Sequence, residues 1–428
     1  MSLLSSLQAP TSSEPRKELS WALLDQGAVS LGNFALNILL ARELTAAQYG
    51  SFAVLFGLLL VLNNFHSALV GYPLSVDLSH RSAQLKSFTS INLLCSLLLT
   101  VLLIPLLVAA TFFIGQPQLI VPLCAALLFW QLQETVRRIL MARLRFKEVF
   151  AGDVVSYIGQ SVIIGALSFK ASLTIPIILQ IIALTSAVAF LLQAHQLGVG
   201  ETTILEVTST IRRYWVIGKW ALLTNTVVGL TALQAFVWMT AYLRGSAEAG
   251  ALQASANLLS LTHPISLALG NLIVPVAARA ASQSGLSLVW PSTKRYIYLF
   301  AFAILPYLLV VATWPNFVSR VFYGPSSPYG HLDLTVRIIT LAYSLNFIGQ
   351  AFGWLLRSVH NSRADFLANA YVMIPCLALA VWTTRHWGIP GAALAMAAMS
   401  ASRVLLLGKF ATNAGIFAAT STAEHAVC

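Results

Sequence analysis

The sequence predicts an all-α integral membrane protein, in which about 12 transmembrane helices form two six-helix halves. Composition, the length of the apolar runs and internal repetition lead to this prediction. The chain has 428 residues, of which 58% are hydrophobic and only 9% are charged, whereas a soluble domain typically has about 25% charged residues. The mean hydropathy is +0.79, and apolar runs of the membrane-crossing length of about 20 residues recur along the chain.

Twelve segments are long and apolar enough to cross about 30 Å of hydrocarbon. The polar lead before them contains two prolines and has no signal-peptide pattern. We therefore expect a disordered cytoplasmic lead at 1–19, a first half at 20–195, a cytoplasmic linker at 196–215, a second half at 216–412 and a cytoplasmic tail at 413–428. The expected spans are 21–41, 49–72, 88–114, 118–141, 149–169, 173–194, 216–242, 249–276, 294–314, 334–356, 365–384 and 388–411.

The net charge of +11, from 25 basic and 14 acidic residues, is explained by orientation in the membrane. If the N-terminus is cytoplasmic, 19 basic residues fall in inner connections and 5 in outer ones, and Arg337 lies within a span. The positive-inside rule then predicts that both termini are cytoplasmic. A nucleic-acid partner is disfavoured, because the basic residues are not gathered on a polar domain.

Three weak internal similarities support the two halves. Trp21-Ala22-Leu23-Leu24 recurs as 220–223, and Ala47-Gln48-x-Gly50 recurs as Ala247-Glu248-x-Gly250. Residues 139–153 match 355–369 more loosely. Together they align span one with span seven and span four with span ten. Because six is even, both halves enter the membrane in the same direction, so the pseudo-two-fold axis should lie along the membrane normal, as in alternating-access transporters.

Polar side chains inside the membrane fall mainly on spans one, two, seven and eight. Span one shows them at steps of four, three and four residues, which is one helical face. Such faces avoid lipid because unpartnered polar groups are costly there. Interhelical hydrogen bonds, worth roughly 0.6 kcal/mol each, are one reading, and a substrate cavity lined by the four helices is the other. The residues assigned to that cavity are Gln26, Ser30, Asn33, Asn37, Asn63, Asn64, His66, Asn225, Gln234, Gln253, Asn257 and His263.

Single residues add sharper hypotheses. Asp25 lies about one turn into span one, and a carboxylate at membrane depth often marks a proton or cation site; it could equally lie at the interface and cap the helix. Lys219, at a similar depth in span seven, anchors the span or contacts phosphate. Pro264 removes a helix hydrogen bond within span eight and is expected to act as a hinge.

Other classes of function lack their motifs. The sequence has no nucleotide-binding Gly-rich loop, no catalytic metal motif and no Gly-x-Ser-x-Gly elbow. The four cysteines show neither metal-ligand spacing nor a disulfide framework. We therefore expect no enzyme activity, no cofactor and no metal.

The segment 20–62, with Ala41-Arg42-x-Leu44, a polar turn and Tyr49-Gly50-x-Phe52, resembles the first hairpin of polysaccharide exporters. These are Wzx-like lipid-linked oligosaccharide flippases of the multidrug/oligosaccharidyl-lipid/polysaccharide (MOP) superfamily. The resemblance implies a bacterial inner-membrane transporter that moves undecaprenyl-diphosphate-linked oligosaccharide from the cytoplasmic to the periplasmic leaflet. It also implies cationic cavity residues for the diphosphate, for which Arg42, Lys219 and Arg337 are the candidates, together with Arg244 near a span end.

The expected partners are the lipid-linked sugar, the bilayer and a polysaccharide polymerase complex. Two alternatives remain open at this point. A multidrug/toxin extrusion antiporter of the same superfamily would share the spans and the pseudo-two-fold, but its cavity would favour acidic and aromatic residues. A membrane polysaccharide polymerase or ligase would need larger outer loops than this chain provides.

Overall fold

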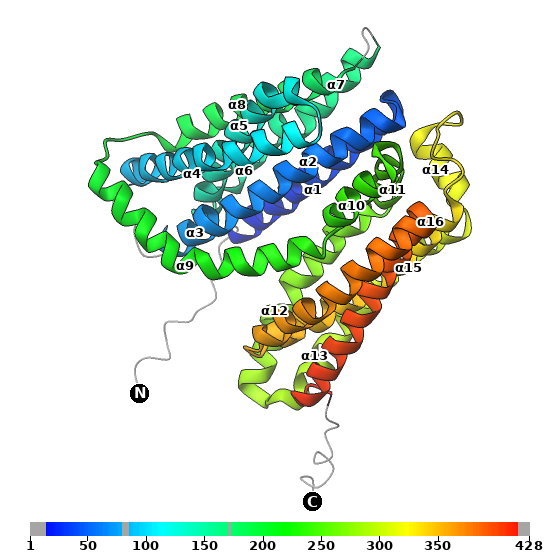
Figure 1. The fold of residues 1–428 in the computed structure, drawn as a ribbon. Coiled ribbons are helices and arrows are strands. Elements are labelled where there is room, and N and C mark those ends of the chain that lie inside the picture. Colours follow the sequence, from blue (N-terminus) through cyan, green and yellow to red (C-terminus); the bar gives the residue numbers. More distant parts are fainter. Residues whose placement is uncertain (1–13, 79–84, 170–172, 418–428) are drawn as a thin grey trace, which may run out of the picture.

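The structure is a computed structural model that describes residues 14–78, 85–169 and 173–417. Within these residues every regular element is a helix. Figure 1 shows the helices gathered into two bundles that meet at one end and diverge toward the other, where the described chain starts and ends. The prediction of an all-helical membrane protein built from two halves is confirmed. We call the end near residues 43–46 the outer end, and the opposite one the inner end.

The first half comprises spans one to six. Two of its spans contain a single π-helical turn, at Ser67–Gly71 and Val154–Ile158, where an extra residue enters the helix. Its helices are α1 (Glu14–Glu43), α2 (Ala46–His66), α3 (Tyr72–Leu78), α4 (Leu85–Phe113), α5 (Ile120–Ala142), α6 (Phe146–Asp153), α7 (Gly159–Ser168) and α8 (Ile175–Leu197).

The second half begins with a broken span and ends with a very long helix. Its helices are α9 (Ile204–Leu230), α10 (Leu233–Arg244), α11 (Ser246–Asn257), α12 (His263–Ser284), α13 (Val289–Thr313), α14 (Pro315–Tyr323), α15 (Asp333–Ser358) and α16 (Ser362–Asn413). Helices α9 and α10 together form one span that is bent by 51°.

Helix starts differ from the sequence expectation at two places. Helix α1 begins at Glu14, inside the lead expected to be irregular, and residues 1–13 lie outside the described residues. Helix α9 begins at Ile204, inside the expected linker 196–215, because Thr203 and Glu206 form a reciprocal capping box. The expected tail, 413–428, is described only as far as 417.

Among the described residues, ten helical segments are long and apolar enough to cross a membrane, and the bent pair makes eleven. Helix α16 has 52 residues, about 78 Å at 1.5 Å per residue, which is far more than one crossing needs. Its backbone leaves helical geometry at Gly388 (φ 62°, ψ −138°). The Thr383 hydroxyl there donates to the carbonyl of Gly391 at 2.9 Å, so the chain reverses and α16 supplies the expected spans eleven and twelve.

The outer end of the molecule is closed by backbone contact between the halves. A Cβ atom on Gly50 of α2 would lie 1.7 Å from the carbonyl oxygen of Ser246, and one on Gly250 of α11 would lie 2.5 Å from that of Ala46. Gly50 and Gly250 also face each other directly. They are the two glycines that the internal repeat equates.

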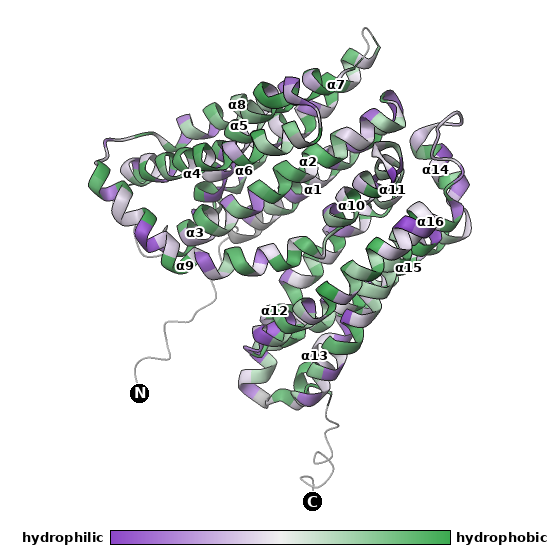
Figure 2. Cartoon of the chain, viewed as in Figure 1, coloured by the Kyte–Doolittle hydropathy of each residue, from purple (hydrophilic) through white to green (hydrophobic). Residues whose placement is uncertain are grey.

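Hydrophobic residues make up much of the helices of both bundles, as Figure 2 shows by colour, and many of the large ones are exposed. Leu102 of α4, Phe302 of α13 and Leu405 of α16 are 73%, 75% and 73% exposed. Large apolar residues at such exposure are unfavourable in water but suit lipid.

Helix α9 lies on the first half, although it belongs to the second by sequence. Gly218 packs against the carbonyl of Ala68, and the Tyr214 hydroxyl donates to Asn92 at 2.9 Å. Arg213 pairs with Asp77 at 2.7 Å. Figure 1 shows α9 running along the edge of the first bundle before the bend into α10.

Candidate functional site

A cavity of about 260 Å³ lies between the two halves. Helices α1, α2 and α5 line it from the first half, and α10, α11 and α15 line it from the second. Five residues that the sequence assigned to a substrate cavity come together here, namely Asn33, Asn37, Gln234, Gln253 and Asn257. The polar faces of spans one, seven and eight therefore meet at one place.

A chain of hydrogen bonds crosses the cavity wall from one half to the other. The Gln253 amide donates to Asn257 Oδ1 at 2.9 Å, and the Asn257 amide donates to the Tyr49 hydroxyl at 2.5 Å. Tyr49 in turn donates to Asn37 Oδ1 at 3.3 Å, and the Asn37 amide donates to the carbonyl of Asn33 at 2.9 Å. Tyr49 is fully buried, so these groups orient one another where little water competes.

Aromatic rings form the rest of the wall. Phe56 stacks between Phe52 and Trp130, with ring centroids 5.3 Å and 5.7 Å away. Tyr157 and Tyr343 also line the cavity. Amides that exchange hydrogen bonds with hydroxyl groups, beside flat apolar rings, suit a ligand that has polar edges and apolar faces.

The other residues assigned to the cavity lie elsewhere. Gln26 donates to Ser30 at 3.3 Å on α1, farther toward the inner end. Asn225 of α9 donates to the carbonyl of Asn64 at 3.5 Å, and Asn64 is exposed. His263 is exposed at the start of α12.

His66 and Asn63 are set within the first half. The His66 imidazole is fully buried and lies 2.8 Å from the Ser96 hydroxyl and 3.1 Å from that of Thr135. Asn63 is partly buried, with an Oδ1 atom that lacks a hydrogen-bond partner. His66 is thus a hydrogen-bonded residue of a bundle interior, apart from the cavity between the halves.

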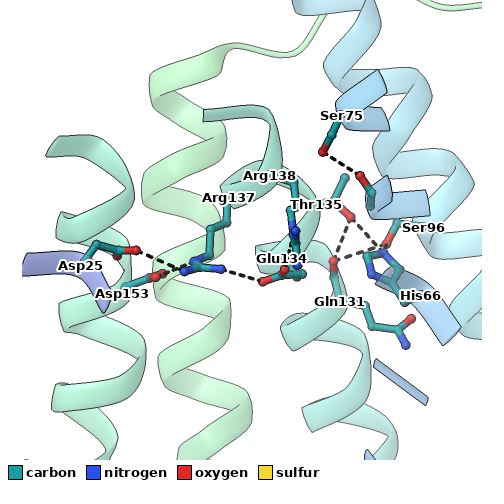
Figure 3. Close-up of polar contacts among 11 residues, drawn as sticks. Asp25, His66, Ser75, Ser96, Gln131, Glu134, Thr135, Arg137, Arg138 and Asp153 are labelled. Atoms are coloured by element: carbon teal, nitrogen blue, oxygen red, sulfur yellow. Dashed lines mark hydrogen bonds and ion pairs between the residues drawn. The ribbon is translucent and has the colours of Figure 1, made fainter. Parts of the chain in front are cut away.

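Asp25 belongs to a buried charge cluster inside the first half, drawn in Figure 3. The Arg137 guanidinium contacts Asp153 at 2.5 Å, Asp25 at 3.2 Å and Glu134 at 3.4 Å. Arg138 contacts the other Glu134 oxygen at 2.6 Å. The side chains of Asp25 and Asp153 are 2% and 0% exposed. Because α1 begins at Glu14, eleven residues before Asp25, Asp25 does not cap its helix.

This cluster contains three carboxylates and two guanidinium groups. The Oδ1 atoms of Asp25 and Asp153 are buried and have no hydrogen-bond partner. Buried charges need pairing to offset the loss of hydration, and one carboxylate here exceeds the available positive charge. The cluster can therefore take up one proton or one monovalent cation with a gain in local neutrality.

The basic residues expected to meet a diphosphate, Arg42, Lys219 and Arg337, are not among the residues that line the cavity. Arg42 joins the halves at the outer end, where it donates to the carbonyls of Phe322 at 2.5 Å and Val321 at 2.9 Å. Arg337 is exposed, four residues after the start of α15 and also near the outer end. Lys219 is exposed on α9, over the ring of Trp220.

Tyrosines reinforce the outer closure beside Arg42. Tyr49 packs edge-on against Tyr329, which contacts Tyr323 in the same way. The Tyr323 hydroxyl donates to the carbonyl of Ala254 at 2.7 Å. Burial raises the pKa of Tyr329 to about 12, so this hydroxyl stays neutral at ordinary pH.

Pro264 lies where span eight is interrupted. Helix α11 ends at Asn257, a single 3₁₀ turn follows, and α12 begins at His263 with Pro264 in its first turn. A proline fits this position because the first turn of a helix needs no backbone donor. The break begins directly after Asn257 and contains Ser260, and both residues line the cavity. The hinge role of Pro264 stays a prediction.

Three important residues did not stand out in the sequence. Arg137 lies at the inner end of expected span four, where the sequence reads it as one of the basic residues of the inner face, and Asp153 lies among apolar residues without a recognisable motif. Tyr49 was part of a resemblance motif but was given no role. The available signal was Asp153 itself, because an intramembrane carboxylate is a functional candidate by default.

No protein-family model and no curated protein matches the chain. Its fold is nevertheless shared with solved structures. An inward-facing multidrug resistance MATE family transporter of the MOP superfamily matches with a TM-score of 0.71 at 13% identity, over 93% of this chain and all of that one. The lipid II flippase MurJ, in an inward closed conformation, matches at 0.66 and 15% over 92% and 87%.

An outward-facing MATE family transporter matches less well, with a TM-score of 0.62 at 13% identity over 93% and 95% of the two chains. At such identities the likeness establishes the fold alone, which the chain shares with these three structures.

Proposed function

We propose that the chain is an alternating-access transporter that flips an undecaprenyl-diphosphate-linked oligosaccharide from the cytoplasmic to the periplasmic leaflet, for O-antigen or exopolysaccharide synthesis. The fold supports transport, because structures with this fold are described as a multidrug transporter and a lipid II flippase. The Wzx-like hairpin at 20–62 supports the lipid-linked sugar.

The chemistry of the cavity carries the choice of substrate. Among the described residues that line it, polar groups are amides and hydroxyls, and none is a carboxylate. A drug cation would gain from a negative charge in the cavity, whereas sugar hydroxyls need donors and acceptors that replace water. Trp130, Tyr157 and Tyr343 of the lining offer aromatic surface for sugar rings. A multidrug extruder is the second candidate, and the fold alone supports it.

The orientation follows from the same proposal. With both termini on the cytoplasmic side of a bacterial inner membrane, the diverging inner ends of the bundles face the cytoplasm. The structure then represents the inward-facing state, ready to take substrate from the inner leaflet. A polysaccharide polymerase complex is the expected partner on the periplasmic side.

Asp25 is the proposed coupling residue, together with Asp153. Their unpartnered oxygens in an acid-rich buried cluster are suited to bind a proton or sodium ion whose return drives the cycle. The outward movement of one negative charge would also gain roughly 2.3 kcal/mol per 100 mV of membrane potential. Exchange of Asp25 for asparagine should abolish dependence on an imposed ion gradient; full, gradient-dependent transport by that variant would contradict the coupling role.

Liposome reconstitution tests the transport proposal. A fluorescent lipid-linked oligosaccharide is placed in both leaflets, and a membrane-impermeant quencher reports exchange between them. We expect faster exchange than in protein-free liposomes, and a reduction by the double exchange of Gln253 and Asn257 for alanine. Efflux of a fluorescent drug cation without any lipid exchange, under every imposed gradient, would favour the multidrug alternative.

A further inference from the structure

A second charge cluster lies in the second half, four residues along the helices from Gly353 and Asn369, the positions that the internal repeat equates with Arg137 and Asp153. The repeat aligns 139–153 with 355–369, so that α5 and α6 correspond to α15 and the start of α16. Here Asp365 contacts Arg403 at 3.3 Å and Arg357 at 3.5 Å. Two guanidinium groups thus share one carboxylate, and the sign of the net charge is opposite to that of the first cluster.

The geometry orients both arginines around Asp365. Arg403 also donates to Asn346 Oδ1 at 3.2 Å, and Arg357 donates to the carbonyl of Gly353 at 3.3 Å. Gly353 leaves room for this arrangement, because a Cβ there would lie 3.2 Å from Asp365 Oδ1. The Nε atom of Arg403 is buried without a hydrogen-bond partner, so the donors of the cluster are not all used.

The second cluster is open, whereas the first is closed. The side chains of Arg357, Arg403 and Asp365 are 44%, 20% and 17% exposed, compared with 11% for Arg137 and 2% for Asp25. Helix α1 covers the first cluster with Asp25. The repeat equates α1 with α9. Helix α9 packs on the first half through Gly218, Tyr214 and Arg213, and it therefore leaves the second cluster uncovered.

The open cluster lies farther toward the inner end than the central cavity. Arg357 stands on the face of α15 that also carries the cavity residue Tyr343. Tyr343 lines the cavity, and residues 346, 350, 353 and 357 follow it at helical spacing on that face. From Tyr343 to Arg357 the helix rises over 14 residues, about 21 Å. A ligand with its polar end in the cavity can therefore reach Arg357 with a group some 20 Å away.

We propose that Arg357 and Arg403 form an anion site that holds the diphosphate of the substrate at the inner mouth of the cavity. The inference rests on the proposed function and names where the charged part of the substrate binds. A guanidinium fork matches phosphate oxygens with two parallel hydrogen bonds, and the surplus positive charge favours an anion. Asp365 acts as a positioning residue that holds both forks and is displaced in part when phosphate binds.

Binding of inorganic pyrophosphate to the full chain in phosphatidylcholine nanodiscs tests this site by calorimetry. We expect Arg357→Gln and Arg403→Gln each to weaken binding about tenfold or more, as for loss of a charged hydrogen-bond donor. Arg403→Lys should fall between. Asp365→Asn should bind at least as tightly as the unaltered chain, because it removes a competing carboxylate. Arg337→Gln, at the outer end of the same helix, is the matched control and should change nothing.

The outcomes separate the candidate ligands. Glycerophosphoglycerol, the headgroup of an anionic bilayer lipid, should compete only weakly with pyrophosphate; equal competition would overturn the assignment to the diphosphate. Unchanged pyrophosphate binding in both glutamine variants would overturn the site itself. Arg357 is half exposed, so its variant remains informative even if the Arg403 variant fails to fold. Leaflet exchange that persists without pyrophosphate binding would refute this site and leave the proposed transport intact.

Discussion

Exchange of Arg137 for leucine perturbs the first half at its most tightly paired charge. Among the described residues, Arg137 is the only ion-pair partner of Asp25 and Asp153, and the variant removes it. The side chains of the two aspartates are 2% and 0% exposed. Glu134 keeps Arg138 at 2.6 Å. Breaking a buried ion pair from one side costs about 3–5 kcal/mol, because the remaining charge stays uncompensated. Two carboxylates are stranded here, so we expect the upper part of that range.

Thermal unfolding in detergent, followed by tryptophan fluorescence, measures the effect. We expect the melting temperature to fall by roughly 5–10 °C, allowing for the size of the chain. Arg138→Leu is the matched control. Its side chain is 36% exposed, and with solvent screening its loss should cost about 1 kcal/mol or less. Equal melting temperatures for the two variants would show that Arg137 contributes no more to stability than Arg138, and would refute the reasoning.

A double variant separates lost charge balance from lost packing. Exchange of both Arg137 and Asp153 for leucine removes one stranded carboxylate together with its partner. Buried ion pairs can be replaced by apolar side chains at little cost, so the double variant should be more stable than Arg137→Leu alone. A further loss of stability on adding the second exchange would show that packing dominates.

Three perturbations address the conformational cycle. Arg42→Gln removes two donors to the carbonyls of α14, a loss of about 1–3 kcal/mol in total. Spin-label distances across the outer end should shift toward an open population. An unchanged distribution would contradict the role of Arg42 in holding the outer end closed. Tyr49→Phe leaves the Asn257 amide unpaired and should lower stability by about 1–3 kcal/mol and slow leaflet exchange; normal melting and exchange would contradict this. Gly50→Val should prevent outer closure and hold the distances open, whereas Gly27→Val, with nothing within 4 Å, should leave them as in the unaltered chain.

Hydropathy and periodicity predicted the fold class, and the reason is physical. A helix in lipid must be apolar over a fixed length, so spans are visible in a single sequence. The amide spacing on span one placed Asn33 and Asn37 on one face, and the structure brings that face to the cavity. Spacing alone does not distinguish Asn37, which lines the cavity, from His66, which is buried within the first half. Both are polar residues within a span, and only helix packing decides which surface each one contacts.

The charged residues show where sequence reasoning ends. Arg137 lies at the inner end of an expected span and looks like an anchor to the inner face, yet it is buried, and α1 and α6 both supply carboxylates to it. Arg42 looks like a cavity cation and instead joins α1 to α14. Pairings between residues more than 100 positions apart depend on how helices pack, which no local pattern records. The placement of α9 on the first half is a further example.

The contact between Gly50 and Gly250 bears on how the two halves could have been assembled. Residues equated by the repeat touch each other, so the pseudo-two-fold axis passes between them. A contact of that kind is isologous, because each surface meets its own counterpart. Two separate copies of a single six-helix half could form the same contact as a homodimer, with one glycine serving both sides. The glycine contact itself therefore needs no surface that differs between the halves, whereas the Arg42 contact with α14 at the same end is made from one half only.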